Sequence, residues 1–154
     1  MYDDEKEAAE TMNVAPGWAK AGVETDGTDT LDESADAHSG GKSQLINVAN
    51  SDEGIVSDGN CFTANKWHLI TMWIKATAGN VRINNNNSTI DFTITSPGAA
   101  WTRYSFVGFS TAANIVFIRS VGGGANFLVD DVSVCQLNDV SITCVPASLA
   151  NSQE

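Results

Sequence analysis

The stretch WHLITMWIKA, residues 67–76, decides the fold. Successive side chains of a β-strand point to opposite faces of the sheet, so apolar residues at every second position predict a half-buried strand. The apolar face carries Ile70, Met72 and Ile74, and the other face carries Thr71, Trp73 and Lys75. We therefore expect a strand with a core side and an outward side that presents a tryptophan.

Similar short segments continue on both sides of this strand. The further expected strands lie at 43–50, 54–64, 80–84, 88–96, 101–109, 113–121 and 126–137. Turn-forming sequences such as NNNNS and VGGGAN separate them, and we interpret VGGGAN as a hairpin turn. Many short alternating strands with turns between them predict an all-β, two-sheet antiparallel sandwich.

The ends of the chain differ in composition from this middle part. Residues 1–14 are expected to form an acidic arm, with a short helix over 3–12 because acids at its start suit the helix dipole. The sandwich would span 15–137, and 138–154 would be a C-terminal extension. The acidic segment 24–36 is interpreted as a long loop or a weak edge strand.

Composition limits the partners of this 154-residue chain. Its formal net charge of -11 argues against duplex nucleic acid and against an anionic membrane surface, since both require a basic face. No run is long enough for a membrane helix, and no signal peptide is visible. An odd number of cysteines leaves at least one thiol free, and their spacing does not suggest zinc. The cysteines are Cys61, Cys135 and Cys144.

No catalytic motif is present, and we expect a protein that is not an enzyme. The sequence lacks the nucleophile-elbow, zinc-protease and phosphate-loop patterns. Of the two histidines, His68 shares its parity with Ile70 and is interpreted as a part-buried strand residue. Adjacent acids on a strand diverge, so Asp130 and Asp131 do not suit glycoside hydrolysis.

Five sequence segments occur together in this order along the chain: GWAKAGVET, AHSGGKSQLINV, WHLITMWIKA, AAWTRYSFVGF and NFLVDDVSV. In this order the chain resembles the jelly-roll carbohydrate-binding modules attached to xylanases and glucanases, and their galactose-binding-like relatives. Similar modules are frequent in phage tail and virion proteins. The resemblance covers about residues 17 to 136 and implies a two-sheet antiparallel jelly-roll β-sandwich.

The acids Asp130 and Asp131 stand side by side among valines. Strand alternation predicts that one of them faces the core, where an unpaired carboxylate is costly. The resemblance implies a structural Ca²⁺ held by Asp131 or Asp130. The carbonyl oxygens would come from His38, Ser39, Gly40 and Gly41. The family's N-terminal glutamate would be either absent here or replaced by Glu7, Glu10 or a loop acid. The alternative is a carboxylate that accepts backbone N–H bonds.

The resemblance also implies a glycan site where aromatic rings stack on sugars. Trp73 is the main candidate, flanked by Thr71, Lys75 and Arg82; the alternative is that Trp73 packs against a neighbouring loop. Trp18 would either stack on the ligand or cap the core. We interpret Trp67 as a lid on the core, and Trp101 as a packing residue or loop anchor.

Two functions follow from these features. The first is a non-catalytic carbohydrate-binding module whose partner is a polysaccharide or a cell-surface glycan. The alternative is a phage virion structural, decoration or adhesion protein that contacts neighbouring virion proteins. Both place the protein outside the cell or on a particle surface, with no nucleic acid and no membrane as partner.

Overall fold

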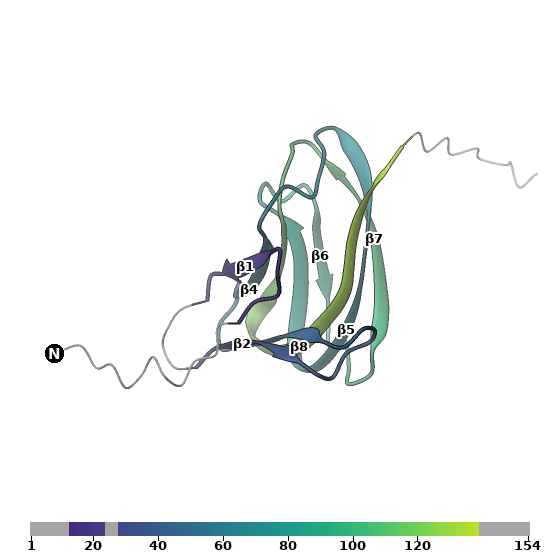
Figure 1. Cartoon of the computed structure of the whole chain (residues 1–154). Coiled ribbons are helices and arrows are strands. Elements are labelled where there is room, and N and C mark those ends of the chain that lie inside the picture. Colours follow the sequence, from purple (N-terminus) through teal and green to yellow (C-terminus); the bar gives the residue numbers. More distant parts are fainter. Residues whose placement is uncertain (1–12, 24–27, 139–154) are drawn as a thin grey trace, which may run out of the picture.

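The computed structural model describes residues 13–23 and 28–138, and every regular element in this part is a β-strand (Figure 1). The strands are β1 (Trp18–Ala21), β2 (Thr30–Ser34), β3 (Ser43–Val48), β4 (Gly54–Ser57), β5 (Lys66–Asn85), β6 (Asp91–Ile94), β7 (Thr102–Ser110) and β8 (Val116–Leu137). The helix expected over 3–12 lies outside the described residues, as does nearly all of the expected arm and C-terminal extension. No described helix is long and apolar enough to cross a membrane.

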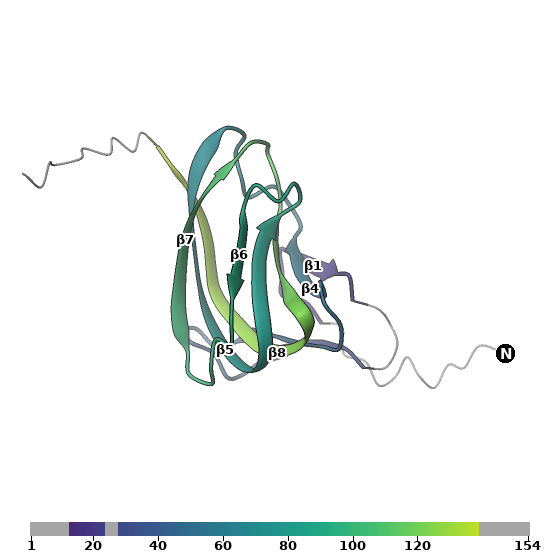
Figure 2. The same cartoon turned by 180° about the vertical axis from the view of Figure 1, so that it is seen from behind.

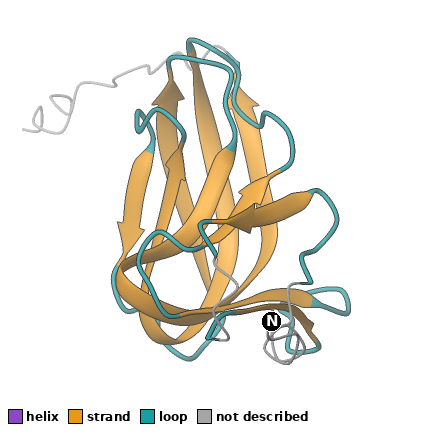
Figure 3. Cartoon of the chain, turned by 90° about the vertical axis from the view of Figure 1, so that its left-hand side faces the viewer, coloured by secondary structure: helices purple, strands orange, loops and turns teal. Residues whose placement is uncertain are grey.

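Two long strands, β5 and β8, pair antiparallel along most of their length and run through both sheets (Figures 1 and 2). The first sheet has the order β2–β3–β8–β5–β7 and uses the second half of β8 and the first half of β5. The second sheet has the order β1–β4–β8–β5–β6 and uses their other halves. The antiparallel two-sheet sandwich predicted from the sequence is confirmed, and Figure 3 shows the two layers from the side.

The β5–β8 ribbon bends sharply where it passes from one sheet to the other. On β5 the bend contains Gly79, at φ +82°, and the pairing register shifts on both sides of Ala78. On β8 it contains Gly122 and Gly123, both at positive φ, which glycine adopts without a steric penalty. A Cβ atom at Gly79 would lie 2.6 Å from the carbonyl oxygen of Gly124, so the two strands approach too closely there for a side chain.

The expectation of a hairpin turn at VGGGAN is therefore wrong. The glycines let β8 bend while it remains paired, so the segments 113–121 and 126–137, expected as two strands, form one strand of 22 residues from Val116 onward. In the same way 67–76 and 80–84 are joined in the 20-residue β5.

The core lies between the two sheets, as the alternation of residues 67–76 predicts. Its buried side chains come from six of the strands, β2 to β6 and β8, and from the loops at positions 23, 62 and 90. Its largest fully buried residues are Phe127, Leu31, Ile46, Ile55, Ile70, Met72, Ile74, Ile83, Ile90, Ile118, His68 and Val81. His68 is thus more deeply buried than the sequence suggested, and its Nε2 accepts the backbone N–H of Thr63 at 3.0 Å.

Candidate functional site

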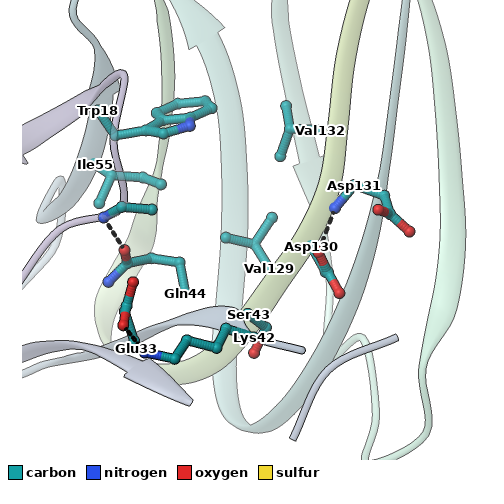
Figure 4. A pocket seen from close by; sticks show the side chains of 11 residues that line it. Trp18, Glu33, Lys42, Ser43, Gln44, Ile55, Val129, Asp130, Asp131 and Val132 are labelled. Atoms are coloured by element: carbon teal, nitrogen blue, oxygen red, sulfur yellow. Dashed lines mark hydrogen bonds and ion pairs between the residues drawn. The ribbon is translucent and has the colours of Figure 1, made fainter. Parts of the chain in front are cut away.

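A β-bulge on β8 places the two adjacent acids. Thr71 of β5 pairs with Ser133 and Trp73 pairs with Asp130, so a single β5 residue opposes two residues of β8. Asp131, the extra residue, has φ +50°. The valines on either side of the acids, 129 and 132, both pack toward the core, and both carboxylates lie on the solvent side (Figure 4). The expectation that one acid faces the core is wrong, because it assumed unbroken alternation.

The two carboxylates hold a loop, residues 35–42, against the sheet. Asp130 Oδ2 accepts the backbone N–H groups of His38 at 2.9 Å and Ser39 at 3.1 Å, and its Oδ1 accepts the N–H of Asp131 at 2.8 Å. Asp131 accepts the hydroxyl of Ser39 at 2.7 Å and contacts His38 Nδ1 at 3.0 Å. The hydrogen bonds from Ser39 and His38 lower the pKa of Asp131. The loop is therefore seated by charge-assisted hydrogen bonds.

The seated loop covers Trp73. The imidazole of His38 stacks on the indole, with ring centroids 3.6 Å apart and an interplanar angle of 12°. Trp101 meets the same imidazole edge-on at 6.3 Å and donates its indole N–H to Asp36 at 3.1 Å. Lys75 forms an ion pair with Asp36, and these two hydrogen bonds lower the pKa of the Asp36 carboxyl. Trp101 is thus a loop anchor, one of the roles expected for it.

Trp73 belongs to the solvent side of the first sheet, which is termed the outer face below. Its members alternate with core residues along three adjacent strands. They are Trp67, Leu69, Thr71, Trp73 and Lys75 of β5, Arg103, Ser105, Val107 and Phe109 of β7, and Ser133, Cys135 and Leu137 of β8.

The end of the outer face opposite to the loop is apolar and open to solvent. Trp67 is 51% exposed and meets its cross-strand neighbour Phe109 edge-on, with centroids 5.4 Å apart. Val107 is 52% exposed, and Leu137 is the other cross-strand neighbour of Trp67. Trp67 is not a lid on the core as expected, because the inward position at this end is occupied by His68.

Hydroxyl groups lie between the two tryptophans. Thr71 has Ser105 directly opposite on β7 and Ser133 directly opposite on β8, so three hydroxyl side chains form a row across the outer face. Arg103 is the cross-strand neighbour of Trp73 on β7 and is exposed, and it has no ion-pair partner within the described residues. The face thus combines stacking surfaces with hydrogen-bonding groups.

Two of the residues expected at the ligand site lie elsewhere. Arg82 is on the second-sheet half of β5, where it donates to both carboxylate oxygens of Asp91, at 2.8 and 2.6 Å, and to Asp52 at 3.2 Å. These hydrogen bonds raise the pKa of Arg82. The structure brings Thr71 and Lys75 to Trp73 but does not bring Arg82 there.

Trp18 lines a separate pocket of about 170 Å³ between the sheets (Figure 4). Ile55, Val129 and Val132 form its apolar wall with the indole, and an ion pair between Glu33 and Lys42 lies at its edge. Trp18 also packs against the core, which is one of the two roles expected for it.

The calcium site stays a prediction. Among residues 13–23 and 28–138, no group of three or more acidic, histidine or cysteine side chains could hold a metal ion. Two of the four residues from which carbonyl oxygens were expected, His38 and Ser39, instead present N–H groups to Asp130, as in the alternative without a metal.

Comparisons with known proteins confirm the fold that the sequence resemblance implied. No protein-family model and no curated protein sequence matches the chain. Among solved structures, the xylan-binding CBM22-1 domain of Paenibacillus barcinonensis Xyn10C is similar, with a TM-score of 0.57 and 13% identity over 82% of this chain and 90% of that domain. The CBM22-1–GH10 modules of Clostridium thermocellum xylanase 10B, complexed with xylohexaose, give a TM-score of 0.58 and 12% identity over 78% of this chain.

A phage protein shares the fold as well. The enzymatically active domain of tailspike protein 4 of bacteriophage CBA120 has a TM-score of 0.57 and 12% identity over 79% of this chain. The chain spans 26% of the length of the xylanase structure and 20% of the length of the tailspike structure. At these identities the likeness is one of fold.

Proposed function

We propose that the chain is a non-catalytic glycan-binding module and that the outer face of the first sheet is its binding surface. The observation that carries this proposal is the combination, on one solvent-facing surface, of a half-exposed tryptophan and a row of hydroxyl groups. Sugar rings present C–H groups that pack on aromatic faces and hydroxyls that need hydrogen-bond partners. The ligand would be a polysaccharide or a cell-surface glycan.

Different residues of the outer face would supply the stacking contacts and the hydrogen bonds to the glycan. Trp67 and Phe109 would supply the stacking surface, and Thr71, Ser105 and Ser133 the hydrogen bonds. The other tryptophan of the face, together with its neighbours Lys75 and Arg103, lies at the end near the 35–42 loop. Trp18 is a candidate for a second contact, in its own pocket.

Two observations support binding without catalysis. The adjacent acids on β8, which also line the Trp18 pocket, both accept hydrogen bonds from the 35–42 loop. The xylan-binding domain that this chain resembles is a binding module, and this chain covers 90% of it. A glycan-binding role would be exercised outside the cell or on a particle surface, where such polymers are met.

The first test is affinity electrophoresis of the purified chain through xylans, β-glucans, mannans and bacterial surface glycans. We expect retardation by one class, followed by a measurable dissociation constant for its oligosaccharides in calorimetry. Unchanged migration through every polysaccharide would remove the proposal.

The phage tailspike likeness favours a second candidate, a structural or adhesion domain on a virion. The two candidates overlap, because a virion domain can also bind host glycans. Stable assembly with particle proteins in the absence of any glycan retardation would favour the second candidate.

A further inference from the structure

The strongest unexplained feature of the outer face is that one of its two tryptophans is already stacked. His38 lies parallel to the Trp73 indole at 3.6 Å, the geometry that a flat ligand ring would adopt there. Among the described residues, the ring contact of Trp67 is an edge-on one with Phe109, which leaves the indole half exposed. One stacking position is therefore occupied from within the chain, and the other is open.

The occupied position is held by contacts that have no part in the core. Asp130 accepts two backbone N–H groups of the 35–42 loop, Asp131 accepts the hydroxyl of Ser39, and Asp36 joins Lys75 to Trp101. These contacts lie at the surface, where each hydrogen bond or ion pair is worth little in comparison with core packing. They hold His38 over Trp73, and none of the residues that make them is a member of the buried core.

The position of His38 limits how far a ligand can lie along β5. From Trp67 to Thr71 the outer face offers about 13 Å of strand, and extending it to Trp73 would give about 20 Å, at roughly 3.3 Å per residue. A glycan chain that stacks on Trp67 and hydrogen-bonds to the hydroxyl row meets the loop directly afterwards.

We infer that His38 is a specificity-determining residue of the outer face, and that it sets the length of the glycan segment by occupying the stacking position on Trp73. The inference rests on the proposed function. The protein selects a short oligosaccharide segment or a chain end, and loss of the imidazole adds one further stacking position for a longer neutral oligosaccharide.

Three variants test this inference against oligosaccharides of two to six units from the class that retards the chain. His38→Ala should raise the affinity for the longest oligosaccharide by about tenfold and leave the disaccharide unchanged, since one ring stack is gained. His38→Phe keeps an aromatic cover and should bind as the wild type does. The double variant His38→Ala/Trp73→Ala should return to wild-type affinity, which assigns the gain to the pair.

A second measurement does not depend on any glycan. The ring protons of His38 should resonate upfield in the NMR spectrum because of the indole ring current, and Trp73→Ala should remove that shift. An unshifted imidazole in the wild type, or an unaltered affinity profile in His38→Ala, would overturn the inference. Loss of binding in Trp67→Ala together with indifference to His38→Ala removes the inference alone, whereas absence of binding in every variant removes the proposed function too.

Discussion

The two tryptophans of the outer face occupy equivalent positions on one strand and yet have opposite surroundings. Trp67 and Trp73 both point to the solvent side of β5, and both have regular cross-strand neighbours on β7. Trp67 is half exposed beside Phe109, whereas Trp73 lies beneath His38. Strand alternation fixes the side of the sheet, and loops from elsewhere in the chain decide what remains open on that side.

The neighbours of the two tryptophans explain the difference. At the Trp73 end, the neighbouring strand β8 carries the acids that hold the 35–42 loop, and one of them, Asp130, is the cross-strand partner of Trp73. At the other end, Leu137 and Phe109 flank Trp67, and neither can anchor a loop through charge-assisted hydrogen bonds. The outer face therefore has a loop-facing end at Trp73 and an open end at Trp67, which is the ligand-facing end under the proposed function.

The largest expected effect tests the ligand-facing end. Trp67→Ala should weaken glycan binding by at least about 30-fold, because a central aromatic contact commonly contributes about 2 kcal/mol or more. Calorimetry with the oligosaccharide identified by affinity electrophoresis measures this. The matched control is Trp73→Ala, which should retain binding. Equal losses in both variants would show that the two ends are not distinct.

The next effect tests the loop-facing end. Asp130→Ala should lower the free energy of unfolding by about 1–2 kcal/mol, because it leaves two loop N–H groups without their acceptor. It should also expose Trp73, which acrylamide quenching of tryptophan fluorescence would detect. Asp58→Ala removes an exposed acid from another loop and should change neither quantity. Quenching equal to that of the wild type would mean that the loop stays in place without Asp130.

A smaller effect on stability is expected for Trp73→Ala itself. The variant loses the ring stack with His38, worth about 1 kcal/mol, while the core side of β5 is untouched. Urea unfolding would measure the change. A loss of several kcal/mol would indicate that Trp73 supports the core and not only the loop.

The smallest effects come from pH and should differ between the two ends. Burial lowers the pKa of His68, the core residue next to Trp67, from its ordinary value of 6.5. The folded state then binds fewer protons than the unfolded state, so stability should fall as pH drops below about 6.5. His68→Gln should flatten this part of the stability profile, and an unaltered slope would contradict the assignment.

The lowered pKa of Asp131 affects stability in a more acidic pH range than that of His68. The contribution of Asp131 to the stability of the fold is fully present when the pH is above the ordinary carboxyl pKa of 3.8. It is lost as the pH falls through the lower pKa of the folded state. A Trp18→Phe/Trp67→Phe background keeps only Trp73 and Trp101, which both contact the loop, and its fluorescence should therefore report loop release only in strong acid. Release near pH 6 would point to another group.

The fold could be predicted from the sequence to the extent that it depends on alternation. Ile70, Met72 and Ile74 are fully buried as their spacing requires, and the edge strand β2 lies within the weakly patterned segment 24–36. The bend at VGGGAN could not be foreseen, because a glycine run is compatible with a hairpin turn and with a corner in a continuous strand. Only the close approach of Gly79 to β8 distinguishes them.

The sequence predicted which residues of β5 face outward at the candidate site, but not how the 35–42 loop covers one of them. The sequence singled out Trp73, Thr71 and Lys75, and all three lie on the outer face. It missed Trp67, although the parity shared with Trp73 was a sufficient signal. It could not show the bulge at Asp131 or the stacking of His38, since both depend on contacts between residues about 35 to 93 positions apart.

The shared ribbon of β5 and β8 has a consequence for how this chain folds. Because each of these strands belongs to both sheets, neither sheet can separate without removing two strands from the other, and the sandwich should unfold in a single cooperative transition. The partners in this ribbon are also remote in sequence, as Trp67 and Leu137 are. Closing such large loops before any pairing is gained is entropically costly, so refolding after dilution from denaturant should take milliseconds to seconds.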